Sequence, residues 1–213
     1  KLGLRKSSVI FFQNSSNRDL FIKLKIARNN TILLPGSGVN LEYHSLRQYP
    51  STDSPIKFIF IGRVKKDKGI EEYLSMATKV KYLYPNTEFQ IIGKCEDQSF
   101  LTQLQKLHSQ GIINYCGTTS DVRPYIESVH CAIMPSYHEG MSNVNLESAA
   151  CGRPIITTNV PGCRETINDG ISGYLIKPKS TIDLVEKVIK FINLPYSEKI
   201  DMGIAGRRKM ENE

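Results

Sequence analysis

Two glutamates in the run that begins at Pro135 are the residues best suited to chemistry. Glu139 follows the apolar segment 131–134 in an expected loop, and Glu147 comes eight positions later, about one and a half turns into a helix expected to begin near Ser142. This layout directs one carboxylate and the free N–H groups of a helix N-terminus at one small volume. Phosphate, sugar hydroxyls and positive charge are what such a volume binds.

The glutamate pair has more than one interpretation. Glu139 and Glu147 could be a general acid/base pair of the glycosidase kind. Glu147 sits within a helix rather than across a cleft from Glu139, so hydrogen bonding to hydroxyls fits it better than proton transfer. A lone glutamate before a helix usually serves the helix dipole. A ligand site is favoured here because Gly140 allows close approach and the capping residues Ser142 and Asn143 leave first-turn amides exposed.

A basic loop over residues 62–69 directly follows a strand predicted over 57–61. Arg63 supplies a planar fork for phosphate oxygens and Lys68 a compact charge, so both could reach a pyrophosphate. A plain basic surface loop is the alternative. The spacing of this loop is not that of a Walker phosphate-binding loop.

The turn Gly36-Ser37-Gly38 resembles the start of a dinucleotide fingerprint, but Leu41 stands where the third glycine belongs and no clear helix opens there. Close backbone approach to a ligand and a tight turn are both open interpretations. His138 and His108 are interpreted as surface or loop histidines rather than acid–base groups.

Composition describes an ordinary globular protein of 213 residues, with 40% apolar and 23% charged residues and a net charge of +7. The basic residues are spread out, which favours a solvated surface over a membrane or nucleic-acid patch. Five cysteines without a C-x-x-C pair indicate reduced thiols rather than zinc or disulfides. The chain begins with Lys1 rather than Met, so the lack of a visible signal peptide decides nothing.

Short apolar runs alternate with amphipathic segments along most of the chain. We predict strands over 9–12, 31–34, 57–61, 88–92, 112–115, 131–134, 154–157 and 173–176, and helices over 16–27, 70–84, 99–109, 122–128, 143–151, 182–192 and 197–210. This pattern predicts an α/β fold with a Rossmann-like parallel sheet covered by helices on both faces. Such sheets bind ligands at the carboxyl ends of their strands, and every candidate residue follows a strand. Residues 48–55 are expected to be a linker.

Together these segments resemble the retaining nucleotide-sugar glycosyltransferases of family four, often called group 1 transferases, which adopt the GT-B fold. The E-x7-E hallmark is matched by Glu139 and Glu147, and the G-R-x-x-x-x-K-G element by residues 62–69. Further segments of the family pattern are matched by residues 35–40, 150–158, 162–167 and 170–173. The match covers roughly residues 30 to 193.

The resemblance implies roles for individual residues. Arg63 and Lys68 would clamp the diphosphate, Glu139 would contact the donor sugar near the reacting centre, and Glu147 would hold the ribose hydroxyls. Backbone amides in the loop and first turn would face phosphate and sugar, and the loop after strand 112–115 would hold the nucleobase. The donor-binding residues expected are Gly36, Ser37, Gly38, Gly62, Gly117, Thr118, Gly140, Met141, Ser142, Asn143, Val144 and Glu147.

The family generally needs no metal, and no D-x-D motif of the metal-using kind is present. We therefore expect no cofactor and no metal, with a nucleotide-diphosphate sugar as substrate, a UDP-sugar in particular. Arg63, Lys68 and a helix N-terminus would stabilise the charge that grows on the leaving diphosphate. By hypothesis, the leaving phosphate is the base that accepts the proton of the acceptor hydroxyl.

The resemblance also implies a domain organisation. Residues 1–30 would be a remnant of the N-terminal acceptor domain, 31–195 the donor-binding domain, and 196–213 a truncated crossover helix. We expect such a fragment to bind donor weakly and to transfer nothing by itself. A glycan or lipid-linked acceptor would be held by the missing domain.

The biological setting expected from the family is bacterial capsule, lipopolysaccharide or exopolysaccharide synthesis, in the cytoplasm, with peripheral association at the inner face of the membrane left open and no nucleic-acid partner. A GT-B-fold UDP-sugar epimerase and a non-catalytic nucleotide-sugar-binding module are the alternative functions.

Overall fold

The computed structural model describes residues 4, 7–28, 30–34, 36, 38–53 and 55–213. Its strands are β1 (Ile10–Phe12), β2 (Thr31–Leu33), β3 (Ile56–Ile61), β4 (Thr87–Ile92), β5 (Asn114–Tyr115), β6 (Cys131–Met134), β7 (Ile155–Thr158) and β8 (Gly173–Ile176). Its helices are α1 (Ser15–Lys23), α2 (Ile70–Leu83), α3 (Gln98–Ser109), α4 (Arg123–Ser128), α5 (Asn143–Ala150), α6 (Thr181–Ile192) and α7 (Tyr196–Asn212), with short 3-10 turns at Lys66–Lys68 and Arg164–Thr166.

Six strands form one parallel sheet in the order β5-β4-β3-β6-β7-β8. From β3 the chain adds strands in one direction and from β6 in the other, so the strand order reverses between these two neighbours. This is the doubly wound arrangement in which a ligand crevice opens at the carboxyl ends of the two central strands. The predicted Rossmann-like parallel sheet is confirmed.

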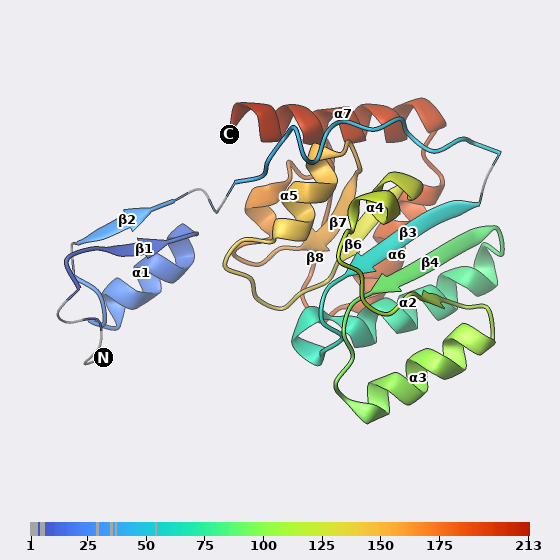
Figure 1. Ribbon diagram of the computed structural model, residues 1–213, viewed down its shortest axis with the longest axis horizontal. Helices are drawn as coiled ribbons and strands as arrows, with labels where there is room; N and C mark the ends of the chain where they lie inside the picture. The colour runs from blue at the N-terminus through green and yellow to red at the C-terminus, as the bar shows by residue number, and fades with distance from the viewer. Residues whose placement is uncertain (1–3, 5–6, 29, 35, 37, 54) are drawn as a thin grey trace.

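The core lies on both faces of this sheet because successive side chains of a strand point to opposite sides. Phe58 and Phe60 of β3 face the helices α2, α3 and α6, while Ile59 and Ile61 face α4 and α5. Helix α7 lies along α5 (Figure 1). Helices cover both faces, as the sequence predicts.

Two predicted elements are shorter than expected. Helix α1 ends at Lys23 rather than at residue 27, because Lys25 adopts a left-handed backbone with φ of 53° that cannot continue a right-handed helix. Strand β5 has two residues rather than four, since only Asn114 and Tyr115 pair with β4.

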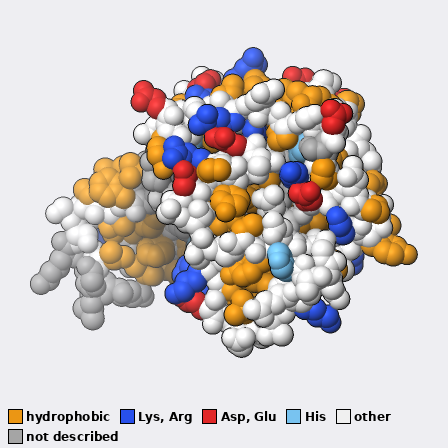
Figure 2. Space-filling view, turned by 45° about the vertical axis from the view of Figure 1, so that its right-hand side comes forward, with side chains coloured by type: hydrophobic (Ala, Val, Ile, Leu, Met, Phe, Trp, Pro, Cys, Tyr) orange, Lys and Arg blue, Asp and Glu red, His pale blue; other side chains and the backbone are white. Residues whose placement is uncertain are grey.

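The first elements form a separate two-stranded parallel sheet, β1-β2, covered by α1 and set apart from the main body in Figure 1. Strand β2 was expected in the donor-binding domain, but its hydrogen-bonding partner is β1, so the sheets separate after residue 33 rather than after residue 30. The domain assignment itself stays a prediction. Apolar side chains are exposed on this small sheet, and hydrophobic atoms gather on this projecting part in Figure 2.

The segment between the two sheets is tied to the main body by a buried arginine. The guanidinium of Arg153 donates to the carbonyls of Arg47 and Gln48 in this segment and to those of Ile126 and Glu127 at the end of α4. A charged fork with this many carbonyl acceptors is an anchor rather than a reactive group. The predicted linker is therefore attached to the main body at its first residue, Gln48.

Charged side chains of both signs are interspersed on the face shown in Figure 2, as a solvated surface predicts. All five cysteines are free thiols. Among the described residues, no helix has the length and apolar character that a membrane crossing needs.

Candidate active site

The loops that follow β3 and β6 lie next to each other, at the point where the strand order reverses. Between them is a cavity of about 250 Å³. It is lined by residues from both loops and from the start of α5: Ile61, Gly62, Arg63, Lys68, Met134, Glu139, Met141, Ser142, Asn143 and Val144. Eight of these ten are predicted site residues, brought together here from segments about 70 positions apart.

Gly69 fixes how closely the two loops approach. Its φ is 73°, and a Cβ on it would come within 2.1 Å of the carbonyl oxygen of Pro135. No other residue fits this position without moving the loop. The Tyr137 amide also donates to the Asp67 carbonyl at 2.9 Å, so backbone contacts on both sides join the loops.

Lys68 and Glu139 form an ion pair inside the cavity. Lys68 Nζ donates to Glu139 Oε1 at 2.5 Å, and the two side chains are only 17% and 15% exposed. The buried hydroxyl of Ser136 donates to the same oxygen at 2.8 Å. The carboxylate is thus held from two sides, while Arg63 lies exposed at the edge of the same cavity.

A tyrosine brace anchors the site loop to α2. The hydroxyl of Tyr137 donates to the buried carboxylate of Glu72 at 2.8 Å, and the ammonium of Lys179 lies 5.0 Å from the tyrosine ring. Burial and the neighbouring Glu72 carboxylate raise the pKa of Tyr137, so this phenol stays protonated as a donor.

The N-terminus of α5 points at the cavity, but one of its expected contacts is already used. Ser142 stands at the capping position, yet its amide donates to the Gly162 carbonyl at 2.8 Å and its hydroxyl makes no capping bond. The expectation that the Ser142 amide faces a ligand is therefore wrong, as is its capping role. Val144 and Asn143 line the cavity from the first turn.

Glu147 lies on α5, as predicted, but it does not line this cavity. It is half-buried, and burial raises the pKa of its carboxyl. Its assignment to ribose hydroxyls stays a prediction.

The predicted glycine turn approaches the site from the other side. A Cβ on Gly36, whose φ is 82°, would meet Cγ of Met141 at 2.7 Å, so the turn packs directly on a cavity residue. Gly38 lines a second cavity described below. Ser37 lies outside the described residues.

The loop expected to hold a nucleobase does not reach the cavity. Gly117 and Thr118 follow β5, and the Gly117 carbonyl accepts from the Gly93 amide at 2.7 Å. Gly93 follows β4, and the Gly62 amide in turn bonds to the last residue of that strand at 2.8 Å. These loops therefore form one continuous edge with Gly62, and nucleobase binding there stays a prediction.

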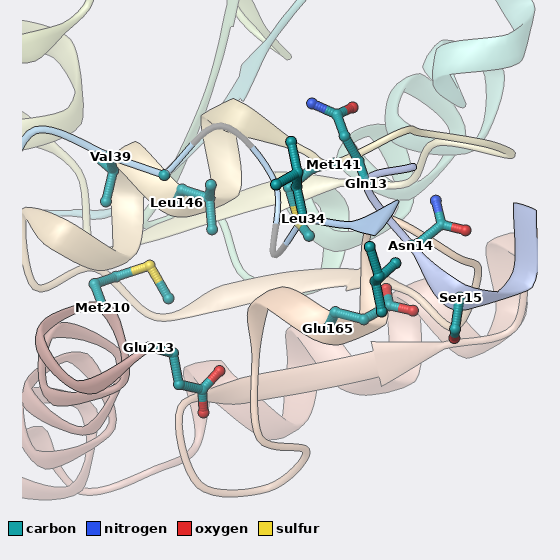
Figure 3. Close-up of a pocket in the computed structure, with 12 residues that line it drawn as sticks. Gln13, Asn14, Ser15, Leu34, Val39, Met141, Leu146, Glu165, Met210 and Glu213 are labelled. Carbon is teal, nitrogen blue, oxygen red and sulfur yellow. The ribbon is translucent and has the colours of Figure 1, made fainter. Parts of the chain in front are cut away.

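A second cavity, of about 320 Å³, shares Met141 with the first. Figure 3 shows its lining: Gln13, Asn14, Ser15, Glu165 and Glu213 supply polar groups, while Leu34, Val39, Leu146 and Met210 supply apolar ones. Asn14 joins the small sheet to the site loop, because its Nδ2 donates to the Gly140 carbonyl at 2.8 Å.

Comparison with known proteins decides the family. The family model described as "Glycosyl transferases group 1" matches residues 45–209, which is well over half of the chain. The chain belongs to the group 1 glycosyltransferase family.

Two relatives of this group 1 chain are named as enzymes that transfer sugars. It is 26% identical over 220 residues to the N,N'-diacetylbacillosaminyl-diphospho-undecaprenol alpha-1,3-N-acetylgalactosaminyltransferase of Campylobacter jejuni, covering 96% of this chain and 56% of the relative. It is 26% identical over 232 residues to the capsular polysaccharide biosynthesis glycosyltransferase CapM of Staphylococcus aureus, covering 100% of this chain and 59% of CapM. The chain thus spans a little more than half the length of these curated relatives.

Solved structures share the fold. The Anabaena protein HepE in complex with UDP-glucose superposes with a TM-score of 0.83 at 14% identity, over 99% of this chain and 60% of HepE. The C-terminal domain of LpcC, a group 1 family protein from Francisella tularensis, superposes with a TM-score of 0.70 at 23% identity, over 83% of this chain and 98% of that domain. The fold class is that of GT-B glycosyltransferases.

Several residues that support this cavity could not be found from the sequence. Ser136 and Tyr137 lie in the run that begins at Pro135, but nothing in that run shows which way their hydroxyls point. Glu72 sits in an ordinary helical pattern, and Asn14 lies more than a hundred residues from its partner. Only Asn14 carries a usable signal, as a capping residue before a predicted helix.

Proposed function

We propose that this chain binds a nucleotide-diphosphate sugar, with UDP as the nucleotide, and that the whole protein transfers the sugar with retention of anomeric configuration. The acceptor in this proposal is a glycan or a lipid-linked glycan of bacterial surface polysaccharide synthesis, bound with the help of further sequence. One observation carries the proposal: Arg63, Lys68, Glu139 and the start of α5 meet around one cavity at the reversal of strand order.

The charges in this cavity suit a leaving diphosphate. Breaking the bond between the anomeric carbon and the phosphate oxygen sends the electron pair to the diphosphate. Lys68 has three N–H donors, so it can hold Glu139 and a phosphate oxygen together. Arg63 and the N-terminal end of α5 add positive potential on the cavity wall.

Retention follows if the acceptor attacks from the face that the diphosphate leaves. The departing phosphate oxygen then takes the acceptor's proton, and no separate protein base is needed. Glu139 contacts the sugar in this scheme and keeps Lys68 in place.

Two relatives support the choice of substrates. HepE, which shares the fold, was crystallised with UDP-glucose. The Campylobacter relative is named for transfer to a diphospho-undecaprenol acceptor.

Calorimetric titration of the chain with UDP-, GDP- and ADP-sugars tests the donor assignment. We expect UDP-sugars to bind with measurable heat and more tightly than the others. Failure of every nucleotide sugar to bind the folded chain would remove the proposal.

Replacement of Lys68 by alanine tests the electrostatic role. We expect Lys68→Ala to weaken UDP binding by about tenfold or more and to lower kcat of the whole protein by about a hundredfold, because a charge-assisted contact to the developing anion is lost. Lys66→Ala is the matched control: Lys66 lies in the same loop but is 70% exposed and pairs with Glu71. Equal losses in the two variants would show that only general positive charge matters.

A further inference from the structure

We propose that Ser136 is a positioning residue, which orients the Glu139 carboxylate so that one oxygen faces the donor sugar. This inference rests on the proposed function. It concerns a side chain that neither the sequence patterns nor the family resemblance singles out.

The two hydrogen bonds to Glu139 converge on one atom. Ser136 Oγ donates to Oε1 at 2.8 Å, and Lys68 Nζ donates to Oε1 at 2.5 Å. Among the described residues, none donates to Oε2. Because the Glu139 side chain lines the cavity, Oε2 is the oxygen left to accept a hydrogen bond from a ligand hydroxyl.

The carboxylate needs such a second anchor. The last torsion of a glutamate side chain has broad, weak preferences, so its rotamer alone does not set the direction of the two oxygens. Lysine carries its charge on a flexible four-carbon stem with freely rotating donors. Lys68 alone would therefore hold the carboxylate without fixing its rotation.

Ser136 is built to supply a fixed direction. The residue is 0% exposed, and its own carbonyl accepts a hydrogen bond from the Thr158 hydroxyl at the end of β7. The next residue, Tyr137, is held through its amide by Asp67 and through its hydroxyl by Glu72. The hydroxyl of Ser136 therefore starts from a backbone anchored on three sides.

This geometry separates two parts of donor affinity. The diphosphate and nucleoside bind through groups that Ser136 does not touch, whereas the sugar meets Glu139 Oε2. Removing the Ser136 hydroxyl leaves the carboxylate free to rotate, so that Oε2 no longer keeps one direction toward the sugar. The expected loss falls on recognition of the sugar and leaves recognition of the nucleotide intact.

The test compares UDP with a UDP-sugar that the chain binds, by calorimetry at equal temperature and salt. For Ser136→Ala we expect binding of the UDP-sugar to weaken by about five- to tenfold, the net size of one ordinary hydrogen bond, with UDP affinity unchanged. Ser148→Ala is the matched control, since Ser148 is also 0% exposed and its hydroxyl has no hydrogen-bond partner among the described residues. A merely structural role would weaken both ligands together.

A double-mutant cycle shows whether Ser136 acts through Glu139. In a Glu139→Gln background, adding Ser136→Ala should cause no further loss of sugar-dependent affinity, because the group that Ser136 orients is already changed. If Ser136→Ala does not fold by circular dichroism, Ser136→Cys takes its place, since a thiol is similar in size but a weak donor.

The outcomes separate the two proposals. A wild-type chain that binds no nucleotide sugar ends the proposed function and this inference with it. A wild-type chain that binds, with Ser136 variants that weaken UDP and UDP-sugar equally or that stay additive with Glu139→Gln, overturns the positioning role alone.

Discussion

Strands β1 and β3 are both short, apolar and parallel to their neighbours, and each is followed by a helix, but their surroundings differ. Four of the six side chains of β3 are buried, with helices on both faces of its sheet. In β1 only Phe12 is buried, and Phe11 is 59% exposed. Helix α2 buries seven residues, whereas α1 buries none. The same local pattern therefore forms in two very different environments.

The difference matters for the site. Arg63, Lys68 and Glu139 stand on loops whose strands are fixed in the large core, so their positions are set by packing on both sides. Gln13 and Asn14 approach the same loop from the small sheet, which makes far fewer buried contacts. The well-packed large sheet and the weakly packed small sheet, β1-β2, thus meet at Gly140, and we call them the rigid half and the weakly packed half.

The largest expected contrast is between two phenylalanines. Phe58→Ala removes a fully buried ring that stacks on Phe89 and packs edge-on against Phe191. We expect it to lower the free energy of unfolding by about 3–5 kcal/mol, because the cavity that it leaves cannot close. Phe11→Ala should change this free energy by less than about 0.5 kcal/mol. Urea unfolding followed by far-ultraviolet circular dichroism measures both.

One outcome would contradict this predicted difference between the two variants. If Phe11→Ala costs as much as Phe58→Ala, the small sheet shares the stability of the large one, and the exposed face of β1 is covered in solution.

The second contrast is in pH dependence, because His130 is buried in the main body. Burial lowers the pKa of His130 to about 4, and the nearby charges of Lys199, Arg153 and Lys57 act in the same direction against a hydrogen bond to Ser51. The Lys57 amide donates to His130 Nδ1 at 3.0 Å, a bond that the neutral ring accepts. The His130 ring is therefore harder to protonate in the folded chain than in the unfolded chain, where it takes up a proton near pH 6.5.

Neutral His130 contributes fully to the free energy of unfolding above pH 6.5, and this contribution is lost as the pH falls toward 4. Between pH 7 and pH 5 the expected loss is about 2 kcal/mol, measured by urea unfolding across this range. His130→Gln should flatten the profile, whereas the exposed His138→Gln should leave it unchanged. An unchanged profile in His130→Gln would assign the pH dependence to other groups.

The fold was predictable from sequence because its strands and helices alternate with little interruption. The two central strands are the most apolar, because β6 contains no charged or polar side chain and Lys57 is the one charged residue of β3, which suits burial on both faces. The strand order, and with it the place of the cavity, could not be read from these strands alone. The strand order depends on which strands pair, and β3 pairs with β6, whose residues lie more than 70 positions later in the chain.

The site was predictable in its residues and less so in their contacts. Lys68 and Glu139 were expected to have separate tasks, and the structure pairs them directly. The Ser142 amide was expected to be free, but Gly162, twenty residues later, accepts its hydrogen bond. Local sequence shows which groups are present, whereas tertiary contacts decide which of them are already used.

The smallest expected effect lies at Asn14, where the two halves meet. Asn14 is 3% exposed, its Oδ1 caps α1 by accepting from the Asn17 amide at 2.8 Å, and its Nδ2 donates to the Gly140 carbonyl. Asn14→Ala removes both bonds, and a lost cap costs about 1 kcal/mol. Since α1 has nine residues and none buried, amide exchange in α1 should rise by about fivefold.

Asn14→Ser separates the two bonds, because a serine hydroxyl can still cap α1 but is too short to reach Gly140. We expect exchange in α1 to stay close to wild type, while the Ser142 amide, which bonds to Gly162 beside this loop, exchanges faster in both variants. If Asn14→Ser speeds exchange in α1 as much as Asn14→Ala does, the contact with Gly140 rather than the cap holds the small sheet together. The weakly packed half would then depend on the rigid half for its structure as well as its position.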